Sequence, residues 1–174
     1  MPHRNFYSLP DPDAQARVLL TGGAGYIGTH TLVELLGTQQ YEVHVLDNLC
    51  NSSAEPMRRA ERIRALEPGA LAANFHEIDL CDEAAVDALF ARVHFDSVIH
   101  FAGLKAVGES VALPLLYYQN NLVSTLVLLR AMKKHGCTSL IFSSSATVYG
   151  LPKSVPITED FPIQPTNPCA FECV

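Results

Sequence analysis

The sequence has no apolar run of bilayer length, fewer basic than acidic side chains, and no cysteine spacing typical of a metal site. The first observation argues against a membrane-spanning helix. Twelve Lys and Arg residues against eighteen Asp and Glu give a net charge of -6, which argues against non-specific binding to nucleic acid. The five cysteines favour reduced thiols in a cytoplasmic protein. We therefore expect no metal, membrane or nucleic acid among its partners.

The composition that is present fits one folded domain. Of the 174 residues, 48% are apolar and 17% charged, which is enough for one hydrophobic core and too little for two large ones. Residues 1–16 contain no apolar signal segment, and we expect them to be a mobile leader. We expect residues 17–150 to form the domain. Residues 151–174 should form a proline-rich loop and an aberrant C-terminal end.

A strand, a glycine-rich turn and a helix follow one another near the N-terminus. The strand is predicted at residues 18–20, and glycines with the spacing G-x-x-G-x-x-G follow it at Gly22, Gly25 and Gly28. The helix should present an apolar face made of Ile27, Leu32, Leu35 and Leu36. Glycine lets the backbone approach a pyrophosphate, and the N–H groups of a first helical turn favour negative charge. From the glycines alone, an ordinary tight turn explains the motif equally well.

Asp47 favours the nucleotide interpretation. It ends a second predicted strand, residues 41–46, at the spacing expected for a carboxylate that binds the adenosine ribose hydroxyls. A carboxylate at this place repels a 2′-phosphate, so the sequence predicts NAD rather than NADP. The alternative is that Asp47 only opens the polar turn that follows it. The glycines and Asp47 together make a dinucleotide site the stronger interpretation.

The remainder of the chain alternates between helices and strands. Helices are predicted at about residues 54–66, 82–90 and 115–134, and strands at about 72–78, 97–100 and 139–142. This alternation predicts an α/β fold with a doubly wound, Rossmann-like parallel sheet in the order 3-2-1-4-5, truncated after strand 5. Ligands of such sheets bind beyond the carboxyl ends of the strands. Glycine or polar breaks fall at all five of these ends: residues 22–28, Asp47, Asp79, residues 101–103 and residues 143–145.

Four stretches, residues 21–30, 46–52, 100–110 and 143–150, resemble the UDP-glucose 4-epimerase family, which belongs to the extended short-chain dehydrogenase/reductase group. The resemblance runs from about Arg17 to Pro168. It implies a tightly held NAD and the interconversion of UDP-glucose and UDP-galactose through a 4-keto sugar. It also implies a homodimeric parent enzyme. The first stretch is common to the wider group, whereas the other three are found in a much narrower set of proteins.

The resemblance also implies roles for individual residues. The pyrophosphate would lie against Gly22, Gly25, Tyr26, Ile27 and Gly28. The adenosine ribose would be held by Asp47, Asn48, Leu49, Cys50, Asn51 and Ser52. Adenine would be bordered by Asp79 and Leu80. The rest of the cofactor would be lined by Phe101, Ala102, Gly103, Leu104, Lys105, Asn120 and Ser143. Ser145 would hydrogen-bond the reacting C4 oxygen of the sugar, although a serine there could also simply cap the turn.

The sequence departs from the family pattern at its end. The family continues with Asn-Pro-Tyr-x-x-x-Lys, in which the tyrosine transfers the proton and the lysine lowers its pKa. Here Asn167 and Pro168 are present, but Cys169 and Cys173 stand where the tyrosine and the lysine belong. We expect neither thiol to substitute, and we read the last six residues as a shifted frame or a spliced product. A Cys-x-x-x-Cys metal or redox site is the weaker alternative.

Three interpretations of function follow. The first is an epimerase by descent, and the second is a catalytically inactive NAD-binding or interaction fragment. The third is another NAD-dependent sugar-nucleotide enzyme such as a 4,6-dehydratase, which the residues at 144–146 and 104–105 disfavour. An apolar stripe at residues 122–129 and the outer edge of the fifth strand are expected to face water, so the isolated chain should be poorly stable.

Overall fold

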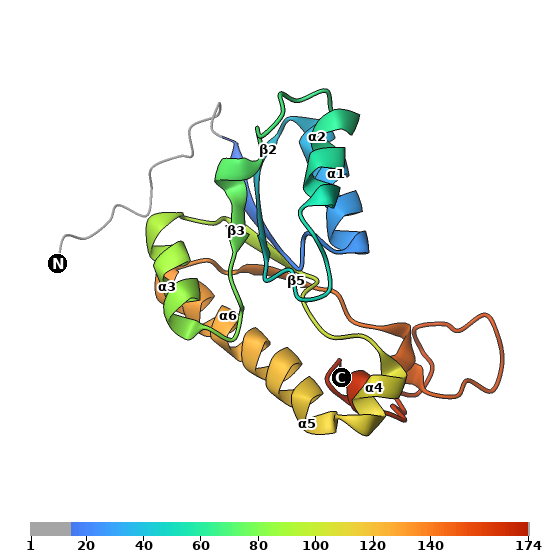
Figure 1. Cartoon of the computed structure of the whole chain (residues 1–174). Coiled ribbons are helices and arrows are strands. Elements are labelled where there is room, and N and C mark those ends of the chain that lie inside the picture. Colours follow the sequence, from blue (N-terminus) through green and yellow to red (C-terminus); the bar gives the residue numbers. More distant parts are fainter. Residues whose placement is uncertain (1–14, 174) are drawn as a thin grey trace.

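A five-stranded parallel sheet forms the centre of the computed structural model, which describes residues 15–173 (Figure 1). The strands lie in the order β3-β2-β1-β4-β5, which confirms the predicted topology. Their bounds are β1 (Ala16–Thr21), β2 (Tyr41–Asp47), β3 (Phe75–Glu77), β4 (Ser97–His100) and β5 (Ser139–Phe142). Strand order reverses between β1 and β4, so the carboxyl ends of these two neighbours border the crevice in which ligands of such sheets bind.

Helices cover both faces of the sheet (Figure 1). On one face, α1 (Tyr26–Thr38) packs beside α2 (Glu55–Ile63), and on the other α3 (Glu83–Arg92) packs beside α6 (Ser124–His135). Successive strand residues point to opposite faces. Leu20 accordingly belongs to the core under α1 and α2, whereas Leu19 belongs to the core under α3 and α6. Strands buried on both faces explain the continuous apolar runs in the sequence.

Six shorter helical elements complete the described chain. They are η1 (Ala72–Asn74), α4 (Val107–Ala112), α5 (Pro114–Tyr117), η2 (Tyr118–Val123), η3 (Ala146–Tyr149) and α7 (Pro168–Phe171). Two predictions need correction here. The strand predicted at residues 72–78 begins only at Phe75, because residues 72–74 form a 3₁₀ turn. The helix predicted at 115–134 is interrupted by η2, a π-helical segment, and α4 and α7 were not predicted as helices.

Some apolar side chains lie where the sequence did not place them. Ile27 is 57% exposed, so the buried face of α1 rests on Leu32, with Leu35 and Leu36 partly buried. Ala16, which was expected to belong to the leader, already pairs with Tyr41 in the sheet. Gln15, also expected in the leader, donates from Nε2 to the Gln39 carbonyl at 2.8 Å, and residues 1–14 lie outside the described residues.

The outer side of β5 and one side of the α5–α6 region expose apolar side chains, as expected. Ile141 is 59% exposed in β5, and Leu126 is 51% exposed in α6. Within residues 15–173, no strand follows β5. No helix in this described part is long and apolar enough to cross a membrane.

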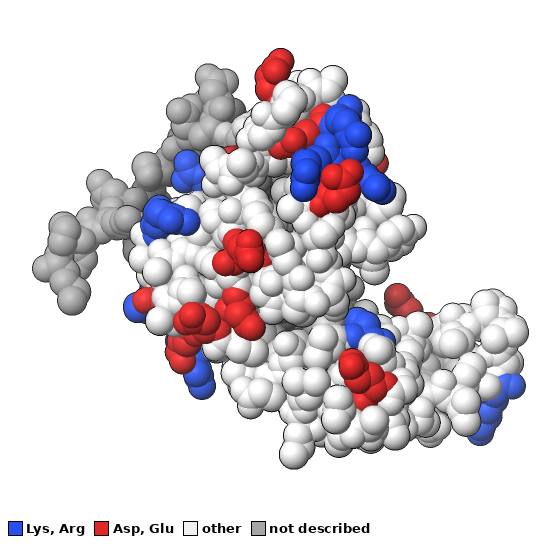
Figure 2. Space-filling model, in the orientation of Figure 1, with Lys and Arg blue, Asp and Glu red and all other residues white. Residues whose placement is uncertain are grey.

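Charged side chains form a small cluster on the solvent side of α2, where Figure 2 shows blue and red atoms together. Arg58, Arg59 and Arg62 all approach the carboxylate of Glu55, at 3.6, 3.2 and 3.0 Å. These arginines are largely exposed, so the cluster is a solvated face of the helix.

Candidate functional site

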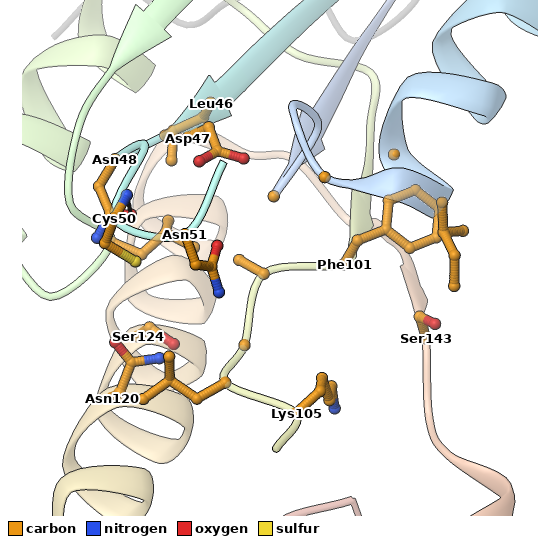
Figure 3. A pocket seen from close by; sticks show the side chains of 18 of the residues that line it. Leu46, Asp47, Asn48, Cys50, Asn51, Phe101, Lys105, Asn120, Ser124 and Ser143 are labelled. Atoms are coloured by element: carbon orange, nitrogen blue, oxygen red, sulfur yellow. Dashed lines mark hydrogen bonds between the residues drawn. The ribbon is translucent and has the colours of Figure 1, made fainter. Parts of the chain in front are cut away.

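A cavity of about 590 Å³ opens at the carboxyl edge of the sheet (Figure 3). All five strands contribute to it through the segments that follow them, and the helix containing η2 closes one side. The cavity is lined by Gly22, Gly25, Tyr26, Ile27, Gly28, Leu46, Asp47, Asn48, Cys50, Asn51, Ile78, Asp79, Leu80, Phe101, Ala102, Gly103, Leu104, Lys105, Asn120, Ser124, Ser143, Ser144 and Ser145. Every predicted site residue in the sheet-edge loops therefore lies on the cavity, apart from Leu49 and Ser52.

Backbone atoms lie too close for a side chain at two positions of the glycine turn after β1. Gly22 has a φ of +66°, and a Cβ there would lie 2.6 Å from the backbone nitrogen of Ala102. A Cβ on Gly28 would lie 2.5 Å from the carbonyl oxygen of Gly22. Among the described residues no side chain caps the N-terminus of α1, whose first turn borders the cavity. The turn thus presents bare backbone and a helix N-terminus to the cavity, which suits a phosphate group.

Asp47 is held in one orientation by its neighbours. Its Oδ2 accepts the Ala24 N–H at 3.1 Å, and its Oδ1 accepts the Leu49 N–H and the Ser52 hydroxyl, both at 2.9 Å. Leu49 and Ser52 were predicted as direct contacts of a ligand. The structure shows that both donate to the carboxylate and so orient it, and that neither lines the cavity. A carboxylate has about four acceptor positions, so these three bonds leave capacity for a hydroxyl in the cavity.

The loops after β2 and β3 are joined beside Asp47. The Asn48 amide donates to Oδ2 of Asp79 at 3.3 Å. Oδ1 of the same carboxylate accepts the Cys81 N–H at 2.8 Å. Asn51 and Cys50 extend over this end of the cavity, as Figure 3 shows. This end therefore gathers polar side chains from two strands, whereas the glycine turn supplies backbone only.

The loop after β4 is fixed by side chains from the helix opposite. Oδ1 of Asn121 accepts the Leu104 N–H at 2.8 Å, and Nδ2 of Asn121 donates to the Leu104 carbonyl at 3.0 Å. The Tyr117 hydroxyl accepts the Ala106 N–H at 3.1 Å. Lys105 lies between these two anchored residues and on the cavity. Sequence reasoning identified Lys105 and Asn120 but missed Asn121 and Tyr117.

His100, at the end of β4, is a buried polar residue that the sequence did not single out. Its Nδ1 lies 2.6 Å from the Thr21 hydroxyl, and its Nε2 lies 3.0 Å from the Thr125 hydroxyl. Burial lowers the pKa of His100 to about 4, and the charge of Lys105 acts in the same direction. The ring is therefore neutral at pH 7 and ties β1, β4 and α6 together beneath the cavity.

The serines after β5 line the cavity, and Ser145 also caps η3. Its Oγ lies 2.8 Å from the Thr147 hydroxyl and accepts the Thr147 N–H at 3.3 Å. The capping role considered as an alternative is therefore present. It does not exclude contact with a ligand, because the residue remains on the cavity.

The two cysteines at the positions of the family's tyrosine and lysine lie close to the same loop. Cys169 is 2% exposed, and its Sγ lies 3.7 Å from the Leu104 carbonyl oxygen. Burial is the main reason that the pKa of the Cys169 thiol is raised. Sγ of Cys173 lies 3.3 Å from Nζ of Lys105. Position 169 therefore holds a buried, protonated thiol at neutral pH, and position 173 adds no cation.

Comparison with known proteins shows to which family the chain belongs. The family model described as GDP-mannose 4,6 dehydratase matches residues 19–171. The chain belongs to this family. Its curated relatives include the UDP-glucose 4-epimerase of Bacillus subtilis, 58% identical over 151 residues, and that of Dictyostelium discoideum, 54% identical over 152 residues. Each alignment covers 87% of this chain, but only 43% and 42% of the relatives.

Solved structures of the family agree with this relationship. UDP-glucose 4-epimerase from Bifidobacterium longum, in complex with NAD+ and UDP, matches with a TM-score of 0.82 and 52% identity. The enzyme from Thermus thermophilus, in complex with NAD, matches with a TM-score of 0.77 and 34% identity. The two alignments cover 91% and 90% of this chain, and 46% and 47% of those chains. The predicted homology to UDP-glucose 4-epimerases is confirmed, and the chain spans less than half the length of the relatives.

Proposed function

We propose that this chain is the NAD-binding part of a UDP-glucose 4-epimerase. The observation that carries the proposal is the cavity on which a glycine turn, an oriented carboxylate and the loops after all five strands converge. The cavity volume lies in the range typical of cofactor sites. When bound, NAD+ supplies the hydride chemistry of such an enzyme, by accepting a hydride from sugar C4 and returning it.

The residues present fit this cofactor. The close backbone approach at Gly22 and Gly28, where a Cβ would collide, leaves room for a pyrophosphate beside the N-terminus of α1. Asp47, fixed by three hydrogen bonds, would accept from a ribose hydroxyl and repel a 2′-phosphate. Asp79 and Leu80 would border adenine. Beyond the pyrophosphate, the loop containing Lys105 and the helix containing Asn120 would enclose the nicotinamide half.

The remaining residues indicate that this chain would bind the cofactor without turnover. Ser145 is placed on the cavity, where it could hydrogen-bond a sugar oxygen. Oxidation of the C4 hydroxyl also requires a base, and such groups contribute roughly 10²- to 10⁴-fold to the rate. Cys169 is buried and its pKa is raised, so it is not a thiolate at neutral pH. We therefore expect the UDP-hexose activity to belong to forms that have a tyrosine and a lysine at positions 169 and 173.

Binding of NADH to the 174-residue chain tests the proposal. The sequence contains no tryptophan, so the change in NADH fluorescence on binding can be measured without energy transfer from that side chain. We expect saturable binding of NADH, displacement by NAD+, and weaker binding of NADPH. We also expect no interconversion of UDP-glucose and UDP-galactose. Absence of NADH binding by a cooperatively folded sample would refute the cofactor assignment, and epimerase turnover would refute the argument from Cys169.

A 4,6-dehydratase is the second candidate, because the matching family model carries that description. The segment Ser144-Ser145-Ala146 disfavours it, since sister dehydratases usually have an acidic residue there. The two candidates are separated by replacing Cys169 with Tyr and Cys173 with Lys in a form extended to the length of the relatives. An epimerase would yield UDP-galactose from UDP-glucose, whereas a dehydratase would yield a 4-keto-6-deoxy sugar.

A further inference from the structure

The helix beside the cavity is interrupted by η2, six residues of π-helix. Segments of this kind are rare and are often found at functional sites. Here η2 contains two consecutive asparagines with different surroundings. Asn120 lines the cavity, whereas Asn121 is only 8% exposed and contacts the loop after β4. Figure 3 shows Asn120 and Ser124 on the helix, and Lys105 on the loop opposite.

Asn121 binds this loop in the way that a neighbouring strand would. Its carboxamide accepts the N–H of Leu104 at 2.8 Å and donates to the carbonyl of Leu104 at 3.0 Å. Nδ2 of Asn120 donates to the same Oδ1 at 2.8 Å, which fixes the orientation of the Asn121 amide. Both backbone polar groups of Leu104 are thereby satisfied by one side chain. No hydrogen bond of the sheet ladder reaches this residue, because β4 ends at His100.

Tyr117 anchors the loop on the other side of Lys105. The residue is fully buried, its hydroxyl accepts the Ala106 N–H at 3.1 Å, and it donates to Oε2 of Glu109 at 2.7 Å. Burial and the neighbouring Glu109 raise the pKa of Tyr117 to about 12, so the hydroxyl keeps its proton at neutral pH. The segment of three residues centred on Lys105 is therefore tied at both ends to the helix that contains η2.

We propose that Asn121 and Tyr117 are positioning residues that hold the Lys105 loop against the nicotinamide half of the bound dinucleotide. The inference rests on the proposed NAD site. The adenosine half of that site is built from other segments, the loops after β2 and β3 with Asp47 and Asp79. Loss of either anchor should consequently weaken binding of the whole dinucleotide while leaving binding of its adenosine diphosphate part intact.

The test compares NADH with ADP as ligands of the same 174-residue variants. Asn121→Ala removes both bonds to Leu104, and Tyr117→Phe removes only the bonds of the hydroxyl group. Tyr118→Phe is the matched control, because it deletes the same atom from the next residue, which neither lines the cavity nor makes the hydrogen bonds that fix the loop. Met132→Ala in α6 controls for lost stability, since Met132 is buried in the core away from the cavity.

Each loop variant should raise the Kd for NADH about tenfold or more, as expected for a lost hydrogen bond that leaves a backbone group unpaired. The Kd for ADP, measured by calorimetry, should change less than about twofold. Both controls should leave the ratio of the Kd for NADH to the Kd for ADP unchanged. Equal losses for NADH and ADP, or no loss for either, would overturn the positioning role. If Asn121→Ala does not fold, Tyr117→Phe decides alone. Failure of the unmutated chain to bind NADH would instead refute the proposed function.

Discussion

Gly28→Ala tests whether the close approach at the glycine turn is needed by the fold and the site. Gly28 lies in the first turn of α1 and is buried. A Cβ on it would lie 2.5 Å from the Gly22 carbonyl oxygen and 2.6 Å from the Cα of Gly23. Ordinary contacts of a Cβ begin at about 3.4 Å. Both obstacles are backbone atoms, so no side-chain rotation can relieve the contact. We therefore expect α1 to move away from the turn by most of an ångström.

The size of the effect follows from two opposing terms. Forcing an extra methyl group into a packed interior costs about 1–3 kcal/mol. Alanine in place of glycine favours a helix by about 1 kcal/mol. The expected net loss is thus up to about 2 kcal/mol, which lowers the Tm of a domain of this size by up to roughly 8 °C. Because the displaced helix N-terminus borders the position that we propose for the pyrophosphate, we also expect NADH to bind at least about tenfold more weakly.

Gly108→Ala supplies the matched control. Gly108 is also helical, in α4, and among the described residues nothing lies within 4 Å of the position of its Cβ. Replacing glycine with alanine restricts the unfolded chain in the same way at both positions. Only at Gly28 does the added methyl group also collide with the folded backbone. Thermal unfolding followed by circular dichroism should rank Gly108→Ala at or above the unmutated protein, and Gly28→Ala below it. Equal unfolding temperatures for both variants, with unchanged NADH binding, would refute the steric reasoning.

Three further predictions concern charged groups. Asp47→Ala should reduce the preference for NADH over NADPH, measured by competitive titration. If the unmutated protein binds both cofactors equally well, the role proposed for Asp47 is wrong. Burial lowers the pKa values of His76 and His100 to about 4, so the unfolded state takes up more protons as pH falls from 6.5 to 4. Stability in urea should decrease across that window, by up to about 3 kcal/mol per histidine, and a flat profile would show that the rings are accessible. Burial raises the pKa of Glu172, and within residues 15–173 its Oε1 has no partner. Glu172→Gln should therefore raise the Tm at pH 7, where the carboxylate is charged, and lose this advantage below pH 4.5; a lower Tm at pH 7 would show that the charge is needed.

The topology could be predicted because each of its determinants is local in the sequence. Short apolar runs mark most of the strands, and glycine or polar residues mark their carboxyl ends. Parallel connection then forces those ends to one edge, so Asp47, Asp79 and the residues at 101–103 had to lie near one another. The glycine spacing identified the turn before any geometry was known, and the positive φ of Gly22 is consistent with that requirement.

Features that depend on contacts across the fold were not predictable in this way. The sequence around Tyr118 reads as continuous helix, and only the backbone of the folded chain shows that residues 118–123 are π-helical. Leu49 and Ser52 lie two and five residues after Asp47, and nothing in this spacing distinguishes a ligand contact from a residue that orients the carboxylate. Ile27 matches the helical period but lines the cavity and is exposed, so it does not belong to the core. The buried hydrogen bonds of His100 likewise involve partners 79 and 25 residues away.

The lining of the cavity comes from the ends of all five strands. A ligand can therefore make all its contacts only when the entire sheet is folded. No subset of strands presents the complete lining, so a partly folded chain should have almost no affinity for the dinucleotide. Thermodynamic linkage then makes the ligand a stabiliser: at a free concentration of about 100 times its Kd, it adds about 2.7 kcal/mol to the free energy of unfolding. For a sheet with exposed apolar residues in β5, that increment would be a substantial part of the total stability. Cofactor concentration would thus control how much of this polypeptide is folded.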